Sequence, residues 1–141
     1  MVTILNWLKR PPDFTIQDNY LLRWHIIPRN KWFNIYLHNI RHSDDDRALH
    51  DHPWYNISII LKGSYIEVTP NGRFKRTQGS IIFRKATGAH RLEINSNKST
   101  WTLFITGPII REWGFHCEKG WVVHYEFLKA ENPGEIGRGC E

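Results

Sequence analysis

Two histidines in the segment HDHPW, residues 50 to 54, are the side chains with the clearest chemical potential. In an extended chain, residues i and i+2 point to the same side, so His50 and His52 would present two imidazoles to one point while Asp51 faces away. Pro53 cannot donate to a strand ladder and therefore favours a strand entrance or edge. Histidine pairs also occur in polar loops and half-buried strands, so the pair alone does not indicate a metal.

A third imidazole comes from His90, in a stretch of alternating residues. His90 shares its parity with Leu92 and Ile94, so we expect it to point toward the core, where a buried ring needs a polar partner. Three neutral imidazoles that converge are good ligands for Fe, Ni, Zn, Cu or Mn, and they leave positions open for water or substrate. The sequence therefore offers His50, His52 and His90 as a metal-ligand set.

The spacing of these residues resembles the two motifs of the cupins, G(X)5HXH(X)3,4E(X)6G and G(X)5PXG(X)2H(X)3N. The matching positions are His50, His52, Asn56, Gly63, Gly79 and His90. The resemblance implies an all-β single domain, a cupin or jelly-roll β-barrel, with a mononuclear divalent metal on the three histidines. Fe(II) is the metal that we expect, with Zn, Ni or Mn as alternatives.

The chain departs from these motifs at several positions. Asp44 stands at the leading glycine of the first motif, and Asn56 replaces its glutamate. In the second motif, Lys85, Thr87 and Ile94 stand at the proline, glycine and asparagine positions. Since the glutamate is absent, the ligand set becomes three histidines, and Asn56 is a weak additional ligand or a substrate contact.

Two groups of cupins share further features with the chain. Thiol dioxygenases also have three histidines and often read HDH, which implies Fe(II), O₂ and a thiolate substrate. However, they commonly use a Ser-x-His-x-Tyr arrangement, whereas this chain has Val122-Val123-His124-Tyr125. The chain is more similar to a group of bacterial and phage-borne cupin-like proteins, which share stretches like DDDRALHDHPW, WTLFITGP and REWGFHC.

Two further segments offer site residues. From Trp32 to Ile40 one face is apolar and the other carries Tyr36 and His38, so this second face is either a pocket wall that binds substrate or an outer face at an oligomer contact.

The segment IIREWGFHC contributes the rest. Arg111 could clamp a carboxylate or phosphate, Glu112 or His116 could act as general base, and Trp113 could contact substrate. The alternative for each of these residues is a surface strand with an internal Arg–Glu pair.

Turn signals recur at short intervals and separate short apolar or alternating runs, which is typical of a sandwich or barrel. We expect an N-terminal extension over residues 1–20 with a short helix at Val2–Lys9, a barrel over 21–128, and a flexible tail over 129–141. The expected strands are Leu21–Ile27, Trp32–Ile40, Tyr55–Lys62, Ser64–Thr69, Phe74–Gln78, Ser80–Arg84, His90–Ile94, Thr100–Thr106, Ile110–Cys117 and Trp121–Leu128.

Composition limits the partners. The chain of 141 residues is 40% apolar, is rich in aromatic residues, and has no apolar run of membrane-spanning length. Its first residues, MVTILNWLKRPP, lack the basic-then-apolar order of a signal peptide, so we expect none. Its net charge of +5 is spread along the chain, so we expect no nucleic-acid partner and no membrane contact. Cys117 and Cys140 are expected as reduced thiols in a cytoplasmic protein. Resemblance to other barrels implies a possible homodimer.

These observations lead to three functional hypotheses. The first is a metalloenzyme of the Fe(II)-dependent oxygenase type that acts on a small polar molecule. The second is a non-catalytic module that holds a small metabolite at the barrel mouth. The third is a metal-dependent isomerase or lyase with no redox step. The identity of the bound metal and the uptake of O₂ distinguish the three hypotheses.

Overall fold

The computed structural model describes residues 9–16, 20–44, 47–94, 98–130 and 137–140. The helix expected over Val2–Lys9 therefore lies almost wholly outside the described residues. The elements are β1 (Phe14–Ile16), β2 (Leu21–His25), β3 (Asn34–Ile40), β4 (Leu49–His50), β5 (Asn56–Lys62), β6 (Ser64–Thr69), β7 (Gly72–Thr77), β8 (Ile81–Arg84), β9 (Arg91–Glu93), β10 (Thr100–Thr106), β11 (Gly114–Cys117), β12 (Gly120–Val123) and α2 (His124–Phe127).

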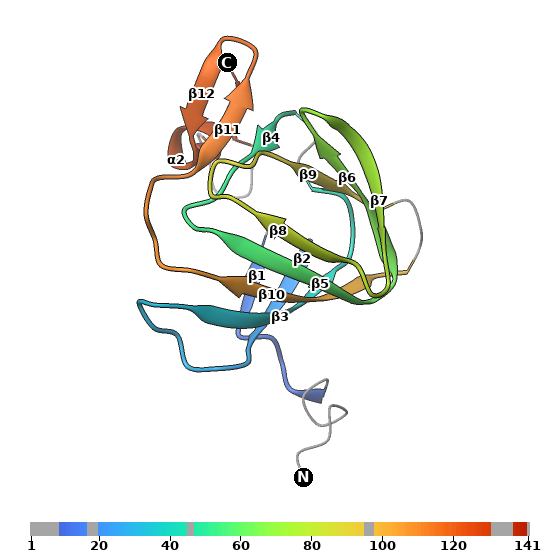
Figure 1. Ribbon diagram of the computed structural model, residues 1–141. Coiled ribbons are helices and arrows are strands. Elements are labelled where there is room, and N and C mark those ends of the chain that lie inside the picture. Colours follow the sequence, from blue (N-terminus) through green and yellow to red (C-terminus); the bar gives the residue numbers. More distant parts are fainter. Residues whose placement is uncertain (1–8, 17–19, 45–46, 95–97, 131–136, 141) are drawn as a thin grey trace.

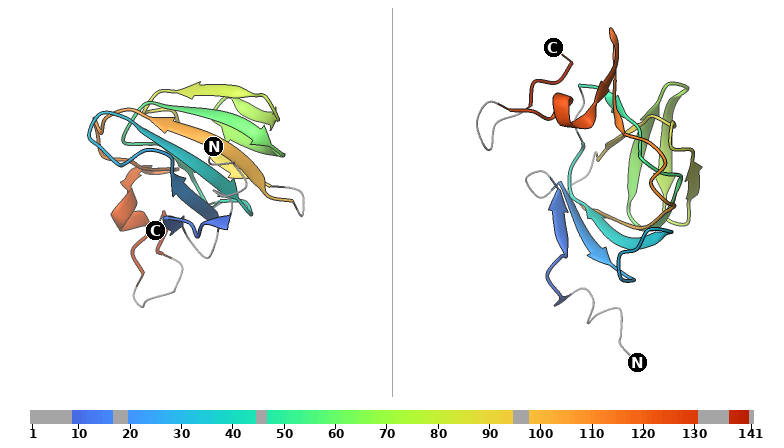
Figure 2. Two further views of the ribbon diagram at one scale, coloured as in Figure 1. Left: turned by 90° about the horizontal axis from the view of Figure 1, so that it is seen from below. Right: turned by 90° about the vertical axis from the view of Figure 1, so that its left-hand side faces the viewer.

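The strands form antiparallel sheets that curve around one interior (Figures 1 and 2). The largest sheet has six strands in the order β1-β2-β3-β10-β5-β8. Two three-stranded sheets, β7-β6-β9 and β12-β11-β4, complete the architecture. The expected all-β barrel is confirmed. Among the described residues, no helix is long and apolar enough to cross a bilayer.

Alternation along the central strands decides which side chains enter the interior. In β10 the threonines and Phe104 are buried, whereas Trp101, Leu103 and Ile105 are partly exposed on the opposite face. Strands β10 and β3 pair without a break, with Thr102 opposite His38 and Phe104 opposite Tyr36. The face of β3 that carries Tyr36 and His38 therefore points inward, which answers the question that the sequence left open.

The carboxyl-terminal part differs most from the expectation. Residues 110–113 do not form a strand, and β11 begins only at Gly114. The strand expected over Trp121–Leu128 ends at Val123 and continues as the single-turn helix α2. The turn is stabilised by tertiary packing, because Phe127 is fully buried and its ring stacks on Phe115 with centroids 3.6 Å apart.

The prediction of two reduced thiols is wrong. Cys117 on β11 and Cys140 near the end of the chain form a disulfide, with their Cα atoms 5.6 Å apart. The Arg47 guanidinium donates to the Gly137 carbonyl at 2.5 Å, and the Gly139 amide donates to the Phe127 carbonyl at 3.0 Å. The end of the expected tail is thus bonded to β11 and α2, and the thiol argument for a cytoplasmic location no longer applies.

Candidate metal centre

The three histidines are brought together by two local features. His50 and His90 form an isolated antiparallel bridge, in which each backbone amide donates to the other residue's carbonyl at 2.9 Å. Directly opposed residues of such a bridge place their side chains on one face. His52 follows His50 by two residues and points to the same side, as the HxH spacing predicts. Its own amide is fixed by the Ala86 carbonyl at 3.0 Å.

The imidazoles form a nearly equilateral cluster. Ring centroids are 5.2 Å apart for His50 and His52, 4.9 Å for His50 and His90, and 4.9 Å for His52 and His90. One ligand atom from each ring lies within 4.8 Å of the others. The predicted convergence of the three rings is confirmed.

Burial and mutual proximity keep these rings neutral. Burial lowers the pKa of His50 and of His52 well below the usual value, and the neighbouring rings and Arg84 lower it further. The pKa of His90 falls to about 4, first through burial and then through the charge of Arg84, although the bond to Glu67 opposes the shift. Neutral imidazole is the form that binds a metal, so the cluster needs no deprotonation at neutral pH.

A buried carboxylate orients one of the rings. Glu67 on β6 is 2% exposed, and its Oε1 lies 2.8 Å from His90 Nδ1. The same carboxylate accepts hydrogen bonds from Arg84 at 2.6 Å and from Arg76 at 2.9 Å. Burial alone would raise the pKa of Glu67, but the bonds from His90 and Arg84 outweigh it and hold the carboxylate ionised. A carboxylate on Nδ1 leaves His90 Nε2 as the ligand nitrogen.

The other two rings also fit a cation. Asp44 Oδ2 lies 3.8 Å from His50 Nδ1, so a second negative charge adjoins the cluster. His52 Nδ1 is buried without a hydrogen-bond partner in the part of the chain that the structure describes. Buried polar atoms are rarely left unsatisfied, and a metal ion among the rings would account for this site. The donor set suits a divalent transition metal.

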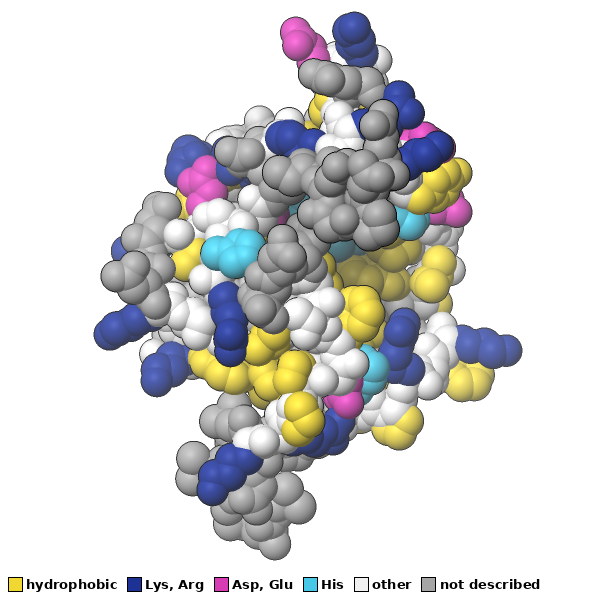
Figure 3. All heavy atoms as spheres, turned by 180° about the vertical axis from the view of Figure 1, so that it is seen from behind, with side chains coloured by type: hydrophobic (Ala, Val, Ile, Leu, Met, Phe, Trp, Pro, Cys, Tyr) yellow, Lys and Arg dark blue, Asp and Glu magenta, His cyan; other side chains and the backbone are white. Residues whose placement is uncertain are grey.

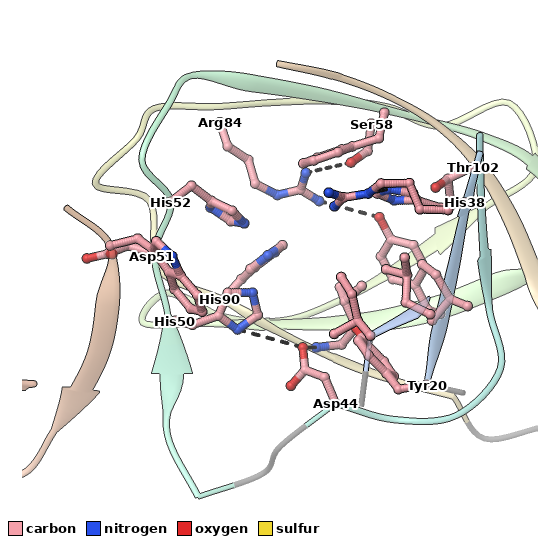
Figure 4. A pocket seen from close by; sticks show the side chains of 18 of the residues that line it. Tyr20, His38, Asp44, His50, Asp51, His52, Ser58, Arg84, His90 and Thr102 are labelled. Atoms are coloured by element: carbon pink, nitrogen blue, oxygen red, sulfur yellow. Dashed lines mark hydrogen bonds and ion pairs between the residues drawn. The ribbon is translucent and has the colours of Figure 1, made fainter. Parts of the chain in front are cut away.

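The cluster lies in the wall of a cavity of about 310 Å³. Figure 4 shows the three histidines at one side of this cavity and His38 with Thr102 at the other. Apolar side chains such as Leu92 and Phe104 form much of the wall between them. On the back of the molecule, Figure 3 shows a hollow with hydrophobic side chains in its depth, while Lys and Arg are scattered over the surface. A small molecule would fit beside the metal.

Comparison with solved structures identifies this architecture. A double-stranded β-helix protein from Klebsiella pneumoniae has a TM-score of 0.56 and 14% identity, covering 71% of this chain and 87% of that chain. A cupin 2 barrel protein from Salinispora arenicola has a TM-score of 0.53 and 17% identity, covering 70% and 86%. The chain has a cupin fold.

The polyketide cyclase RemF from Streptomyces resistomycificus is a further structural neighbour of this chain. Its TM-score is 0.55 at 17% identity, covering 70% of this chain and 69% of that chain. No family model and no curated protein matches the sequence. At such identities the neighbours show the fold of the chain and leave its reaction open.

The predicted substrate contacts divide into two groups in this cupin fold. His38 and Trp113 line the cavity. Tyr36 is only 2% exposed, and its ring lies beneath the Arg23 guanidinium, whose Cζ is 4.3 Å from the Tyr36 ring centroid. Tyr36 therefore supports the cavity wall without lining it. The Asn56 oxygen accepts a hydrogen bond from Arg84 at 3.1 Å, and Asn56 does not line the cavity.

The three predicted catalytic residues of the chain lie behind the histidine cluster. Asp51, which points away from the two imidazoles beside it, is 1% exposed and bonds to Arg111 at 2.9 Å and to His116 at 2.9 Å. Glu112 is largely exposed and lies 3.6 Å from His124 Nε2. None of the three lines the cavity, and their assignment to catalysis stays a prediction.

Glu67, Arg84 and Arg23 belong to the site but were not predicted from the sequence. Arg84 donates to Glu67, Asn56 and Ser58 from within the barrel, and Arg23 lines the cavity. A signal was present for the first two, because Glu67 and Arg84 share their parity with Tyr65 and Ile82, which are buried. Opposite charges on the inward faces of two strands indicate a buried polar network.

Proposed function

We propose that this cupin is a mononuclear Fe(II)-dependent oxygenase that acts on a small molecule held in the cavity. The observation that carries the proposal is the cluster of three neutral imidazoles, two buried and one half-buried, in the wall of a chamber of about 310 Å³. Three protein ligands leave coordination positions open, which suits a catalytic site better than a structural one. Bound Fe(II) would supply a redox-active Lewis acid at those positions.

The chain's own residues would prepare this centre in two ways. The Glu67 carboxylate holds His90 by its Nδ1, which fixes the ring orientation and the nitrogen that faces the metal. Apolar groups such as Phe104, whose ring centroid lies 6.5 Å from that of His52, keep bulk water from the neighbourhood of the rings. The chamber therefore provides ligands, a fixed geometry and a largely apolar surrounding.

The test begins with anaerobic purification, elemental analysis and measurement of O₂ uptake. Thiols, diketones and aromatic acids serve as trial substrates. We expect about one iron per chain, O₂ consumption with one of these classes, and loss of both in His52→Ala. His42→Ala, which removes an exposed imidazole outside the cluster, should retain both. Iron content that is the same in His52→Ala as in the unaltered chain would contradict the site.

A second candidate function is a non-redox lyase or isomerase reaction at the same metal. Two structural neighbours favour it, since one is the DMSP lyase DddQ from Ruegeria pomeroyi and another is a polyketide cyclase. Zinc in every preparation, together with no O₂ uptake, would support this reaction class. A metabolite found in the cavity of a chain that never contains metal would instead indicate a non-catalytic binding module.

We also propose that two copies of the chain pair through the outer face of the large sheet. Two apolar rows cross four adjacent strands on that face, as the strand register shows. They are Phe83–Ile57–Ile105–Ile35 and Ile81–Ile59–Leu103–Leu37. No member is charged, and an apolar face of this kind is complementary to itself, as a two-fold contact requires.

A further inference from the structure

A second functional feature of the cavity is the Arg23 guanidinium on β2. Arg23 lines the cavity and is partly buried, yet no described carboxylate forms an ion pair with it. Its Nε donates to His38 Nε2 at 2.9 Å, and its two terminal nitrogens make no hydrogen bond in the part of the chain that the structure describes. Burial lowers the pKa of this group, and the nearby Arg29 charge adds to the effect. A partly buried cation without a counter-ion favours an anionic ligand.

The bond between Arg23 and His38 also determines what His38 can do. Since Nε2 of His38 accepts from Arg23, the ring proton must lie on Nδ1. Burial and the Arg23 charge hold the pKa of His38 well below the usual range, so the ring is neutral. Arg23 and His38 are directly opposed in the β2–β3 register, which fixes their relation. Together they offer the terminal N–H groups of one guanidinium and a neutral ring N–H.

The position of this pair relative to the metal cluster is set by Phe104. The Phe104 ring centroid lies 5.0 Å from that of His38 and 6.5 Å from that of His52. The Phe104 ring thus neighbours both polar regions, which Figure 4 shows at opposite sides of the cavity. A ligand that reaches both needs an apolar body about as long as that ring, with a polar group at each end.

The other charged groups near the cavity are already engaged. Arg84 is compensated by Glu67, with their closest atoms 2.6 Å apart. Asp51 accepts hydrogen bonds from the Gly114 amide and the Trp121 indole, besides its contacts with Arg111 and His116. Asp44 Oδ2 accepts a hydrogen bond from the Leu92 amide at 3.0 Å. Arg23 is thus the cavity cation that has no described carboxylate partner, and its described partners are His38 and the face of the Tyr36 ring.

We propose that the cavity binds a small carboxylate whose anionic group rests on Arg23 and His38 while its apolar body lies along Phe104 toward the three histidines. A planar carboxylate matches the fork of terminal guanidinium nitrogens, which can donate two parallel hydrogen bonds. The metal at the opposite end rests on the proposed function above. The carboxylate subsite itself does not need the metal.

The test compares benzoate with benzamide, a neutral molecule of the same shape. Dissociation constants are measured by calorimetry on the full chain, both after chelator treatment and after loading with Zn²⁺. We expect benzoate to bind at least about tenfold tighter than benzamide in both states, since hydrogen bonds to charged groups are the stronger ones. Arg23→Gln should abolish the preference. Arg29→Gln, which removes an exposed positive charge near Arg23, should retain it.

Several outcomes would overturn the assignment. One is a benzoate preference in Arg23→Gln that equals the preference of the unaltered chain. Another is a loss of that preference in Arg29→Gln as large as the loss in Arg23→Gln. Benzoate that binds only to the Zn²⁺-loaded chain would place the carboxylate on the metal, and tighter binding of phenyl phosphate would make the ligand a phosphate. If Arg23→Gln fails to fold, Arg23→Lys takes its place, with an expected intermediate preference. Normal Zn²⁺ content in these variants separates this result from failure of the metal site.

Discussion

Glu67 combines two tasks that are usually separate, since it orients a ligand ring and balances buried arginine. Its two oxygens receive hydrogen bonds from Arg76 and Arg84 and contact His90 Nδ1. Removal of one partner from a buried ionic group is costly, because the remaining charge is left without compensation. The same residue therefore affects both the stability of the barrel and its affinity for metal.

Glu67→Gln should lower both the affinity for metal and the stability of the fold, and the two losses can be measured separately. We expect metal affinity to fall about 10- to 100-fold, because the ring loses its charged acceptor. The free energy of unfolding should fall by about 3–5 kcal/mol, because Arg84 loses its counter-ion. Chelator competition and urea denaturation measure the two quantities. Glu93→Gln removes a carboxylate that is paired with Arg73 and Arg91 outside the cavity, and it should leave metal affinity unchanged. Unchanged affinity in Glu67→Gln would contradict the orienting role.

The buried imidazoles also predict how stability depends on pH. In the metal-free chain, His38, His50, His52 and His90 have folded-state pKa values below the unfolded value of about 6.5, with His90 at about 4. The unfolded chain therefore binds more protons below pH 6.5. The free energy of unfolding should be constant above that pH and fall as the pH drops toward 5, by up to about 1.4 kcal/mol per pH unit for each imidazole.

Urea denaturation of chelator-treated protein between pH 7.5 and 5 measures this slope. Glu67 stays ionised throughout this range, because its pKa lies below the usual value, and so it does not add to the slope. His38→Asn should reduce the slope of the free energy of unfolding against pH by the contribution of one imidazole. His42→Asn, at an exposed position, should not change this slope. Equal stability at pH 7.5 and pH 5 would show that the rings are not buried in their neutral form.

The ligands were predictable from the sequence because two-residue periodicity places His50 and His52 on one side and points His90 inward. Glu67 and Arg84 were not predicted: parity with buried neighbours points both side chains inward, but no local pattern specifies the contact between β6 and β8 that pairs them. Arg111 and His116 were assigned to catalysis from residue type alone. Their position behind the cluster is decided by Asp51, which binds both of them.

At the scale of elements, the alternation of inward and outward side chains predicted the central strands but not the structure of the carboxyl-terminal segment. Ser64–Thr69 and Thr100–Thr106 match the expected bounds, because each has a clear inward and outward face. The segment His124–Phe127 carries no strong helical signal, and its single turn exists because Phe127 packs against Phe115. Such a contact overrides local preference, so sequence periodicity could not locate the end of β12.

The Cys117–Cys140 disulfide links this segment to the end of the chain and leads to a test at the same scale. A link across 23 residues should stabilise the protein by about 3 kcal/mol in the loop-entropy account. We expect no free thiol in purified, unreduced protein unfolded in denaturant, and a lower melting temperature after a reductant is added. Cys140→Ser should melt at the lower temperature with or without reductant. Two free thiols in the unreduced sample would contradict the bond.

At the scale of the whole molecule, the two faces of the large sheet differ in character. The inner face carries His38 and Phe104 toward the cavity, whereas the outer face is apolar across β3, β10, β5 and β8. Strand β8 also ends the sheet, so it leaves an edge unpaired by the described strands. Ile81 is 71% exposed and Phe83 is 63% exposed on this strand. Large exposed side chains on a continuous apolar face favour contact with another protein surface.

If two copies pair through this face, a charge within the apolar rows should separate them. Light scattering after size exclusion should give twice the chain mass for the unaltered protein and the single chain mass for Phe83→Lys, because the face would have to bury two lysines around the two-fold axis. Ile109→Lys alters an isoleucine that is 74% exposed but lies outside the rows, so it should remain paired. The cavity lies on the inner face, so Phe83→Lys should still bind Zn²⁺ and benzoate like the unaltered chain. A single chain mass for the unaltered protein at all concentrations would refute the pairing and leave the metal site unaffected.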